Sequence, residues 1–136
     1  MFKLDSSDLE MHILKEIEPI KEMVKSEQIH FYKNSSGSDE GIYIFSDLQG
    51  YHFVYSERGE ETKHKVTDSL FEITFWVINH LVSSVALEML KENVNKVKDQ
   101  RQYIFEKKLE LLEIVGTNYK KAGEIQISEI LKDNPL

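Results

Sequence analysis

The stretch that most constrains this chain covers residues 67–94. Between residues 70 and 90, apolar side chains point in nearly every direction around a helix of 3.6 residues per turn. A helix that is apolar most of the way round has to be buried on several sides, so we expect it at the centre of the core. Ser69 followed three residues later by Glu72 is the pattern of a capping box, which predicts where this helix begins.

The same stretch is long enough to span a membrane. Polar and charged residues interrupt it at Glu72, Asn79, His80, Ser83, Ser84 and Glu88. Each of them is costly in hydrocarbon. We therefore interpret the stretch as the central helix of a soluble core.

Length and composition indicate an ordinary globular protein. The 136 residues are the size of one domain, which we place at residues 1–136, and 40 % are hydrophobic and 30 % charged. The net charge of −7 argues against direct binding to nucleic acid or to an anionic membrane. The sequence contains no cysteine, and its first ten residues lack the apolar core of a secretory signal, so we expect a cytoplasmic protein.

The first segment is predicted to be a helix with two different faces. Ser7 and Glu10 form another capping box, and apolar residues follow at helical spacing to about Glu27. Pro19 lies inside this pattern. Because proline removes a backbone hydrogen bond and crowds the preceding turn, we expect a kink or break near Glu18.

The middle of the chain reads as a small sheet. Strand-like runs occupy residues 42–45, 51–58 and 61–66, and a weaker run covers residues 28–33. In the second of them Tyr51, Phe53 and Tyr55 alternate with His52, Val54 and Ser56, which makes one face strongly aromatic. Turns are expected at residues 46–50 and at residues 59 and 60. The pattern predicts a small antiparallel β-meander of three or four strands.

Two more helices are expected after the central one. Asp99 is a predicted cap for the first of them, and Gly116 is placed to end it. Asn118 is a predicted cap for the second, with Ile125 among its inward residues. The fold class is therefore α+β: an N-terminal helix, the meander, the long central buried helix, and two C-terminal helices packed on one face of the sheet.

Motifs for catalysis or cofactor binding are missing from the sequence. The five histidines never occur at a metal-ligand spacing, the six glycines form no phosphate loop, and no serine sits in a nucleophile elbow. We therefore predict a protein that is not an enzyme and has no cofactor or metal. His52 and His64 lie on neighbouring predicted strands, and whether they meet is left open.

An acidic surface is the candidate binding site. Its charged members are Glu57, Arg58, Glu60, Glu61, Asp39, Glu40 and Asp47. The first four would lie on a rigid two-stranded arm, near the acidic loop that contains the other three, and would present negative charge to a basic protein. Tyr43, Tyr51 and Tyr55 would supply aromatic anchors beside them. The alternatives are a solvated hairpin tip and a tyrosine-rich core face.

Four blocks in order resemble the immunity protein 63 family of bacterial polymorphic toxin systems. They are G-Y-H-F-V-Y-S-E-R-G-E-E at residues 50–61, T-D-S-L-F-E-I-T-F-W-V-I at 67–78, I-F-E-K-K-L-E-L-L at 104–112, and the closing E-I-L-K-D-N-P-L. The resemblance implies a cytoplasmic protein that binds and neutralises a cognate toxin domain, protecting the producing cell and its kin. It implies no catalytic residue, and we expect a basic toxin, such as one that degrades nucleic acid.

The resemblance also implies roles for single residues. Gly59 would form the turn, Trp76 and Phe105 would lie in the core, and Arg101 matches the family pattern with Gln100 and Gln102 beside it in place of a second arginine. The alternative function is a non-catalytic interaction or scaffolding module, including a homodimer formed through the helical layer. A third hypothesis, a hydrolase with paired carboxylates, lacks an identifiable buried partner acid.

Overall fold

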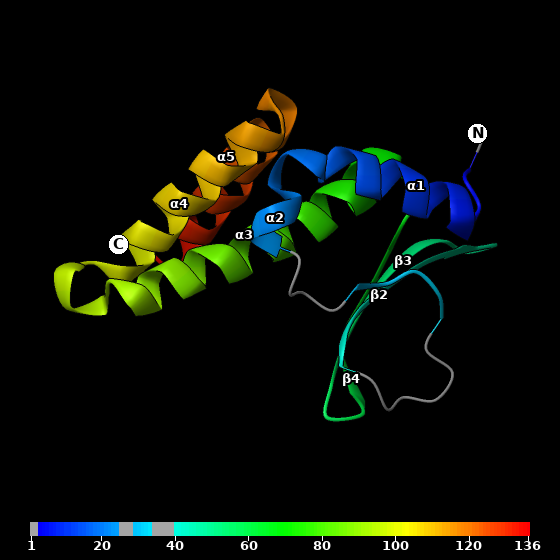
Figure 1. Ribbon diagram of the computed structural model, residues 1–136, viewed down its shortest axis with the longest axis horizontal. Coiled ribbons are helices and arrows are strands. Elements are labelled where there is room, and N and C mark those ends of the chain that lie inside the picture. The colour runs from blue at the N-terminus through cyan, green and yellow to red at the C-terminus, as the bar shows by residue number, and fades with distance from the viewer. Residues whose placement is uncertain (1–2, 25–28, 34–39) are drawn as a thin grey trace. The chain divides into compact units, whose positions relative to one another are not determined.

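A computed structural model describes residues 3–24, 29–33 and 40–136 of the chain. The chain divides into two compact units, residues 1–17 with 26–77 and residues 18–25 with 78–136. The boundary falls within the longest helix, α3 (Leu70–Glu92), which is green in Figure 1. The expectation of one domain over residues 1–136 stays a prediction.

The order of elements confirms the α+β class. The first unit holds helix α1 (Ser6–Glu16) and strands β1 (Ile29–His30), β2 (Gly41–Asp47), β3 (Gly50–Glu57) and β4 (Glu60–Thr67), and ends in the first part of α3. The second unit holds a 3₁₀ turn (Glu18–Ile20), α2 (Lys21–Val24), the rest of α3, a second 3₁₀ turn (Val94–Lys96), α4 (Gln100–Val115) and α5 (Thr117–Asp133).

Helix α3 has the capping and burial that its sequence predicts. The Glu72 amide donates to Ser69 Oγ at 3.0 Å, which confirms the predicted start. Its buried apolar residues are Ile73, Phe75, Val77, Ile78, Leu81, Val82, Ala86 and Leu90. By length and composition alone α3 is also long and apolar enough to cross a membrane, a test that core helices of soluble proteins pass as well.

The predicted start of α1 is wrong, and the break predicted at its end is confirmed. Asp5 caps it, because the Asp8 amide donates to Asp5 Oδ1 at 2.8 Å, so the predicted cap at Ser7 is wrong. Ser7 already lies inside the first turn, where the helical backbone is established. At the other end the break expected near Glu18 is confirmed: α1 ends at Glu16 and Pro19 sits in the 3₁₀ turn.

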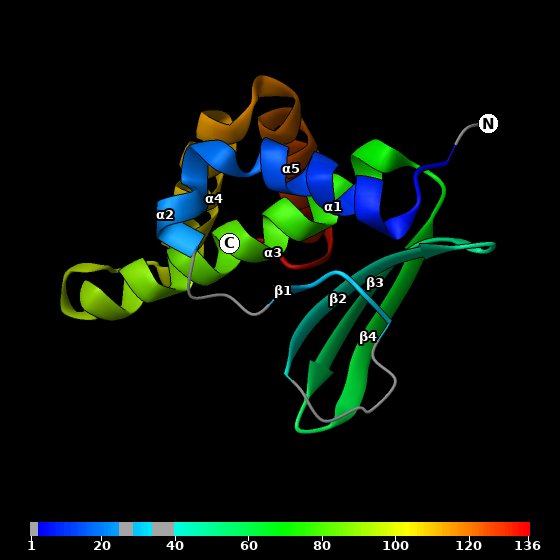
Figure 2. The same ribbon diagram turned by 45° about the vertical axis from the view of Figure 1, so that its right-hand side comes forward.

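The sheet has four strands in the order β1-β2-β3-β4, and Figure 2 shows its twist. Strands β2, β3 and β4 are antiparallel, as expected for a meander. Strand β1 instead runs parallel to β2, with Ile29 opposite Ile42 and His30 opposite Tyr43. The sheet is therefore mixed. The parallel pair was not predicted, because a strand of two residues is too short for its sequence to indicate its direction.

Strand β3 lies between two partners and is covered on both faces. Tyr51, Phe53 and Tyr55 point to one face, as the alternation predicts, and Phe53 meets Trp76 of α3 edge to face with ring centroids 6.4 Å apart. The opposite face carries His52, Val54 and Ser56, and all three are buried as well. This second face was expected to be mixed, and it is almost fully covered.

Backbone conformation fixes the hairpin between β3 and β4. Arg58 and Gly59 have φ values of 54° and 80°, and Glu57 pairs with Glu60 on either side of them. Positive φ at both central residues is the pattern of a type I′ turn, which matches the twist of the flanking strands. The turn is therefore centred one residue earlier than predicted, and Gly59 has the turn role that the resemblance implies.

Helices α4 and α5 pack on one another in the second unit. Gly116 ends α4, as predicted, and the same residue precedes α5, so Asn118 is not its cap. Tyr119, Gly123 and Ile127, four residues apart, form the buried stripe of α5. Ile125 lies half a turn away and is 63 % exposed, so its prediction as an inward residue is wrong. Whether these helices cover the sheet stays a prediction.

A lysine is buried at the contact between α4 and α5. The side chain of Lys108 is only 6 % exposed and donates to Gln126 Oε1 at 3.5 Å. Burial lowers the pKa of Lys108 below its ordinary value, because the charged ammonium loses its hydration. Burial of the Lys108 ammonium therefore lowers the free energy of unfolding.

Replacing Lys108 by Met should stabilise the second unit by about 1 to 3 kcal/mol at pH 7, since the buried ammonium is removed and the apolar stem is kept. In the wild type the lowered pKa makes the unfolded chain hold more protons just below pH 10.5, so stability should rise there with pH. Lys108→Met should lack that rise. Urea unfolding at pH 7 and pH 10 measures both effects.

Lys121→Met, at an exposed lysine of α5, is the matched control and should change stability by less than about 0.5 kcal/mol. If Lys108→Met unfolds more easily than the wild type at pH 7, the buried lysine is not an energetic cost.

Candidate functional site

The hairpin between β3 and β4 carries an exposed acidic tip, formed by Glu57, Arg58, Glu60 and Glu61. All four side chains are exposed, and Glu57 and Glu60 are directly opposite each other in the register. Like charges at opposite positions of two strands destabilise a hairpin. The tip thus concentrates negative charge at a cost to its own stability and holds it on a rigid turn.

The structure separates the other acidic candidates. Glu40 is exposed and directly precedes Gly41, which pairs with Ser56 at the tip end of β3. Asp47 pairs with Gly50 at the opposite end of β3, about 23 Å away at the usual rise per residue. Asp47 is therefore not part of the tip, and Asp39 lies outside the described residues.

Two of the three tyrosine candidates, Tyr43 and Tyr51, are part of the folded core, and Tyr55 is partly exposed. Tyr43 is 0 % exposed, and its ring stacks on His30 with centroids 4.5 Å apart. Tyr51 is buried as well, and its hydroxyl accepts a hydrogen bond from the Leu4 amide at 2.8 Å. These contacts are those of the tyrosine-rich core face that was the alternative, so we leave Tyr43 out of the binding surface.

A chain of four side chains runs across the face of the sheet that holds His52, from β2 to β4. His52 Nε2 is 2.7 Å from Asp47 Oδ1, and His52 Nδ1 is 2.9 Å from His64 Nε2. His64 Nδ1 is in turn 3.6 Å from Glu61 Oε2. We call these four residues the histidine relay. His52 and His64 therefore meet, a point that the sequence left open.

The register of the strands explains how the relay forms. The Leu48–Gln49 turn places Phe45 opposite His52 and Asp47 opposite Gly50, so Asp47 and His52 are diagonal neighbours on one face. Between β3 and β4 the register shifts, so that Tyr55 pairs with Lys63 and Ser56 with Glu61. This bulge turns Glu61 to the face that holds His64.

Hydrogen-bond chemistry fixes the protons of the relay in its neutral state. An ionised Asp47 accepts only, so His52 carries its proton on Nε2 and its Nδ1 is an acceptor. His64 must then donate from Nε2, which leaves a lone pair on Nδ1 beside the Glu61 carboxylate. His52, only 2 % exposed, is further held by stacking on Phe45 with centroids 4.4 Å apart.

The residues that the family resemblance singled out make structural contacts. Trp76 lies beside Phe53, and the Lys65 ammonium sits 4.3 Å from the Trp76 ring centroid, a cation–π contact. In the second unit the Arg101 guanidinium lies 5.4 Å from the Phe105 ring centroid and donates to the Pro135 carbonyl at 3.4 Å. Arg101 thereby ties the start of α4 to the end of the chain.

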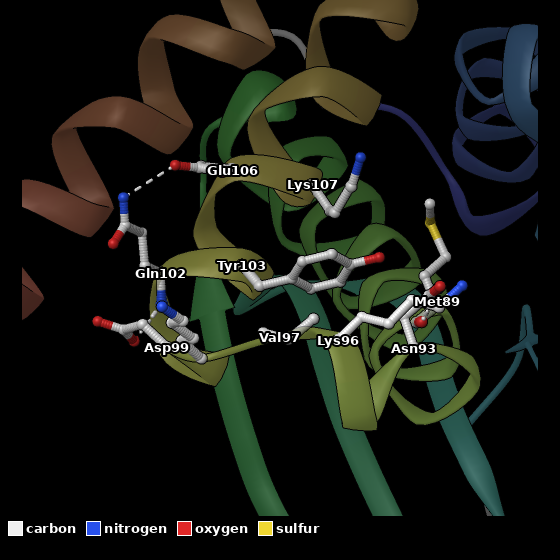
Figure 3. Close-up of a pocket in the computed structure, with 10 residues that line it drawn as sticks. Met89, Asn93, Lys96, Val97, Asp99, Gln102, Tyr103, Glu106 and Lys107 are labelled. Atoms are coloured by element: carbon white, nitrogen blue, oxygen red, sulfur yellow. Dashed lines mark hydrogen bonds between the residues drawn. The ribbon is translucent and has the colours of Figure 1, made fainter.

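An open groove of about 620 Å³ lies in the second unit between the end of α3 and the start of α4. In Figure 3 the Tyr103 ring extends across it toward Met89. Its two acids are already engaged: Asp99 Oδ1 accepts from the Gln102 amide at 3.0 Å, and Glu106 accepts from the Gln102 side chain at 3.0 Å. The groove therefore offers contact area and no poised acid or base.

Within the part of the chain that the structure describes, no three histidine or acidic side chains converge in a way that would hold a metal ion. The nitrogens of His52 and His64 that face each other are engaged in their mutual hydrogen bond. The relay is thus a hydrogen-bonded network in this conformation. The prediction placed neither Asp47 nor Glu61 with the two histidines, although the spacing of five residues between Asp47 and His52 across a predicted turn was a usable signal.

Comparison with known proteins decides the family. The family model for immunity protein 63 matches residues 46–129, which span β3, β4, α3, α4 and most of α5. This chain belongs to the immunity protein 63 family. The resemblance drawn from the sequence is thereby confirmed, and membership supports an immunity role. Searches of curated proteins and of solved structures found no match.

The Asp47 carboxylate should make the free energy of unfolding depend on pH at acidic pH. The hydrogen bond from His52 holds the pKa of Asp47 below its ordinary value of 3.8. A lowered folded-state pKa contributes stability above pH 3.8, and that stability is lost as the pH falls through the lowered value. Asp47→Asn should therefore be less stable than the wild type at pH 7, and the difference should shrink toward pH 3.

Thermal unfolding between pH 7 and pH 3 measures this difference. Asp133→Asn, at an exposed position at the end of α5, is the control. A difference between Asp47→Asn and wild type that stays constant across this range would show that the Asp47 carboxylate contributes no proton-linked stability.

Proposed function

We propose that this chain is an immunity protein that binds and neutralises a cognate bacterial toxin domain in a stoichiometric complex. The observation that carries the proposal is membership of the immunity protein 63 family over residues 46–129. In this proposal it acts in the bacterial cytoplasm, where it protects the producing cell and its kin from a toxin of a polymorphic toxin system. It acts by binding, without catalysis or cofactor.

The charge of the chain supports a basic partner. The net charge is −7, and three exposed carboxylates of the acidic tip, Glu57, Glu60 and Glu61, gather on one rigid turn. Toxins that degrade nucleic acid need positive charge to hold phosphate groups. An acidic tip inserted into such a cleft would replace the substrate's charge and block access, so we propose a basic, nucleic-acid-degrading toxin domain as partner.

Electrostatic attraction sets mainly the rate at which such a complex forms. Complementary charges raise association rate constants above the values of neutral pairs and make them depend on salt. A protein that must neutralise a toxin soon after synthesis gains from fast association. The four charged residues of the tip, with Glu40 at the same end of β3, are the surface that we assign to this step.

A second candidate function has one observation in its favour. Ile114 of α4 and Ile125 of α5 are exposed, and a groove of about 400 Å³ in the same unit is lined by Leu109, Ile127 and Leu131, together with Glu124, Ser128 and Lys132. An apolar helical surface of this kind suits a homodimer or a scaffolding module. Light scattering of the purified chain tests the homodimer. A chain that is monomeric at about 100 µM would rule it out.

Co-expression tests the proposed function directly. The toxin domain encoded beside this chain is expressed in a sensitive bacterium with and without the chain. Survival only in its presence, together with a 1:1 complex on co-purification, is the expected result. Equal killing in both strains with no complex would refute the proposal.

Reversing the tip charge should slow complex formation. The variant with Glu57, Glu60 and Glu61 changed to Lys should associate about 10- to 100-fold more slowly than the wild type at low salt, with a weaker salt dependence. Stopped-flow association at two salt concentrations measures both quantities. The control changes the exposed Glu92, Glu124 and Glu129 to Lys, which alters net charge equally in the second unit.

If both triple variants slow association by the same factor, net charge acts alone and the acidic tip is not the contact.

A further inference from the structure

We propose that a proton bound at His64 competes with a basic partner for Glu61, so that toxin binding by this chain weakens as the pH falls. The inference rests on the proposed function and adds its regulation. It follows from the histidine relay, in which Glu61 belongs both to the proton network and to the acidic tip.

The neutral relay ends in an unfavourable juxtaposition. His64 Nδ1 carries a lone pair and lies 3.6 Å from the Glu61 carboxylate, so two acceptors face each other. A proton on His64 Nδ1 converts this contact into an ion pair and leaves the His64–His52 and His52–Asp47 hydrogen bonds in place. The relay therefore has a ready place for one proton.

A second proton does not fit. It would have to go to His52 Nδ1, which lies 2.9 Å from His64 Nε2, and two N–H groups would then point at each other. The contact between the two rings thus leaves room for a single added proton, on the exposed ring of the pair.

Charged groups of both signs lie around the relay. Carboxylates bound it on both sides, Asp47 from β2 and Glu61 from β4, and the Lys3 ammonium bonds the backbone carbonyl of Asp47. Lys63 and Lys65 flank His64 in the sequence but belong to the other face, where Lys63 pairs with Tyr55 and Lys65 lies over Trp76. Phe45, stacked on His52, adds no charge.

The Glu61 carboxylate cannot pair fully with His64 and with a cation of the partner at the same time. The side chains of Glu61 and His64 are 59 % and 41 % exposed, so a lysine or arginine of a basic partner can reach this carboxylate. A partner cation at Glu61 removes the counter-charge of the imidazolium, and the imidazolium in turn repels the cation. By linkage, the complex then holds fewer protons than the free protein, and acid weakens it.

Two measurements on the full chain test the inference. In the free protein, ¹⁵N-edited NMR of the imidazoles should show His52 with its proton on Nε2 throughout and His64 taking up one proton between pH 8 and 5.5. Titration of His52 to an imidazolium in that range would overturn the single-proton relay.

The second measurement is the dissociation constant with a catalytically inactive cognate toxin domain at pH 8 and 5.5. Wild type should weaken by about three- to tenfold on acidification. His64→Gln should bind at pH 8 like the wild type and lose most of the pH dependence, whereas the control His12→Gln, in α1, should keep it. Affinity that does not change with pH in the wild type would overturn the inference and leave the proposed function standing. If no complex forms at pH 8, the proposed function is refuted, and this inference with it.

Discussion

The register that β3 keeps with its two neighbours is the constraint on which the first unit depends. Because β3 is buried on both faces, a slip of one residue would bring Tyr51, Phe53 and Tyr55 to the wrong side and break every contact described for them. Two tight turns hold this register. Gly50 has φ of 137° and a Cβ there would lie 2.8 Å from the Thr67 carbonyl oxygen, and Arg58 with Gly59 completes the other turn.

The same register decides which polar groups meet. A two-residue turn makes Asp47 and His52 diagonal neighbours, and the bulge opposite Ser56 brings Glu61 beside His64. The result is a hydrogen-bonded relay on one face of the sheet and a tip with exposed negative charge, which share Glu61. Main-chain pairing of β3 with β4 positions the tip before any partner is present, so little conformational entropy would be lost on binding. The proposed recognition surface and the histidine relay therefore lie on the same strand pair.

Periodicity and capping predicted most of the fold. The apolar run after Ser69, the break at Pro19, the cap at Asp99 and the stop at Gly116 all depend on local chemistry, and the structure has each of them. The direction of β1 depends on contacts between distant segments, which local patterns do not encode, whereas the cap at Asp5 and the exposure of Ile125 are local features that the prediction assigned wrongly. Like the direction of β1, the place of Asp47 is set by strand pairing, so the prediction put it close to the tip although it lies at the far end of β3.

Amide hydrogen exchange of the 1:1 complex with the cognate toxin domain tests the account most directly. If this immunity protein 63 family member captures its partner through the acidic tip, the amides around Arg58 and Gly59 should exchange more slowly in the complex than in the free protein. Those of α5 should change little, since no part of the assigned surface lies there. Protection confined to α4 and α5, with the hairpin amides unchanged, would contradict the account.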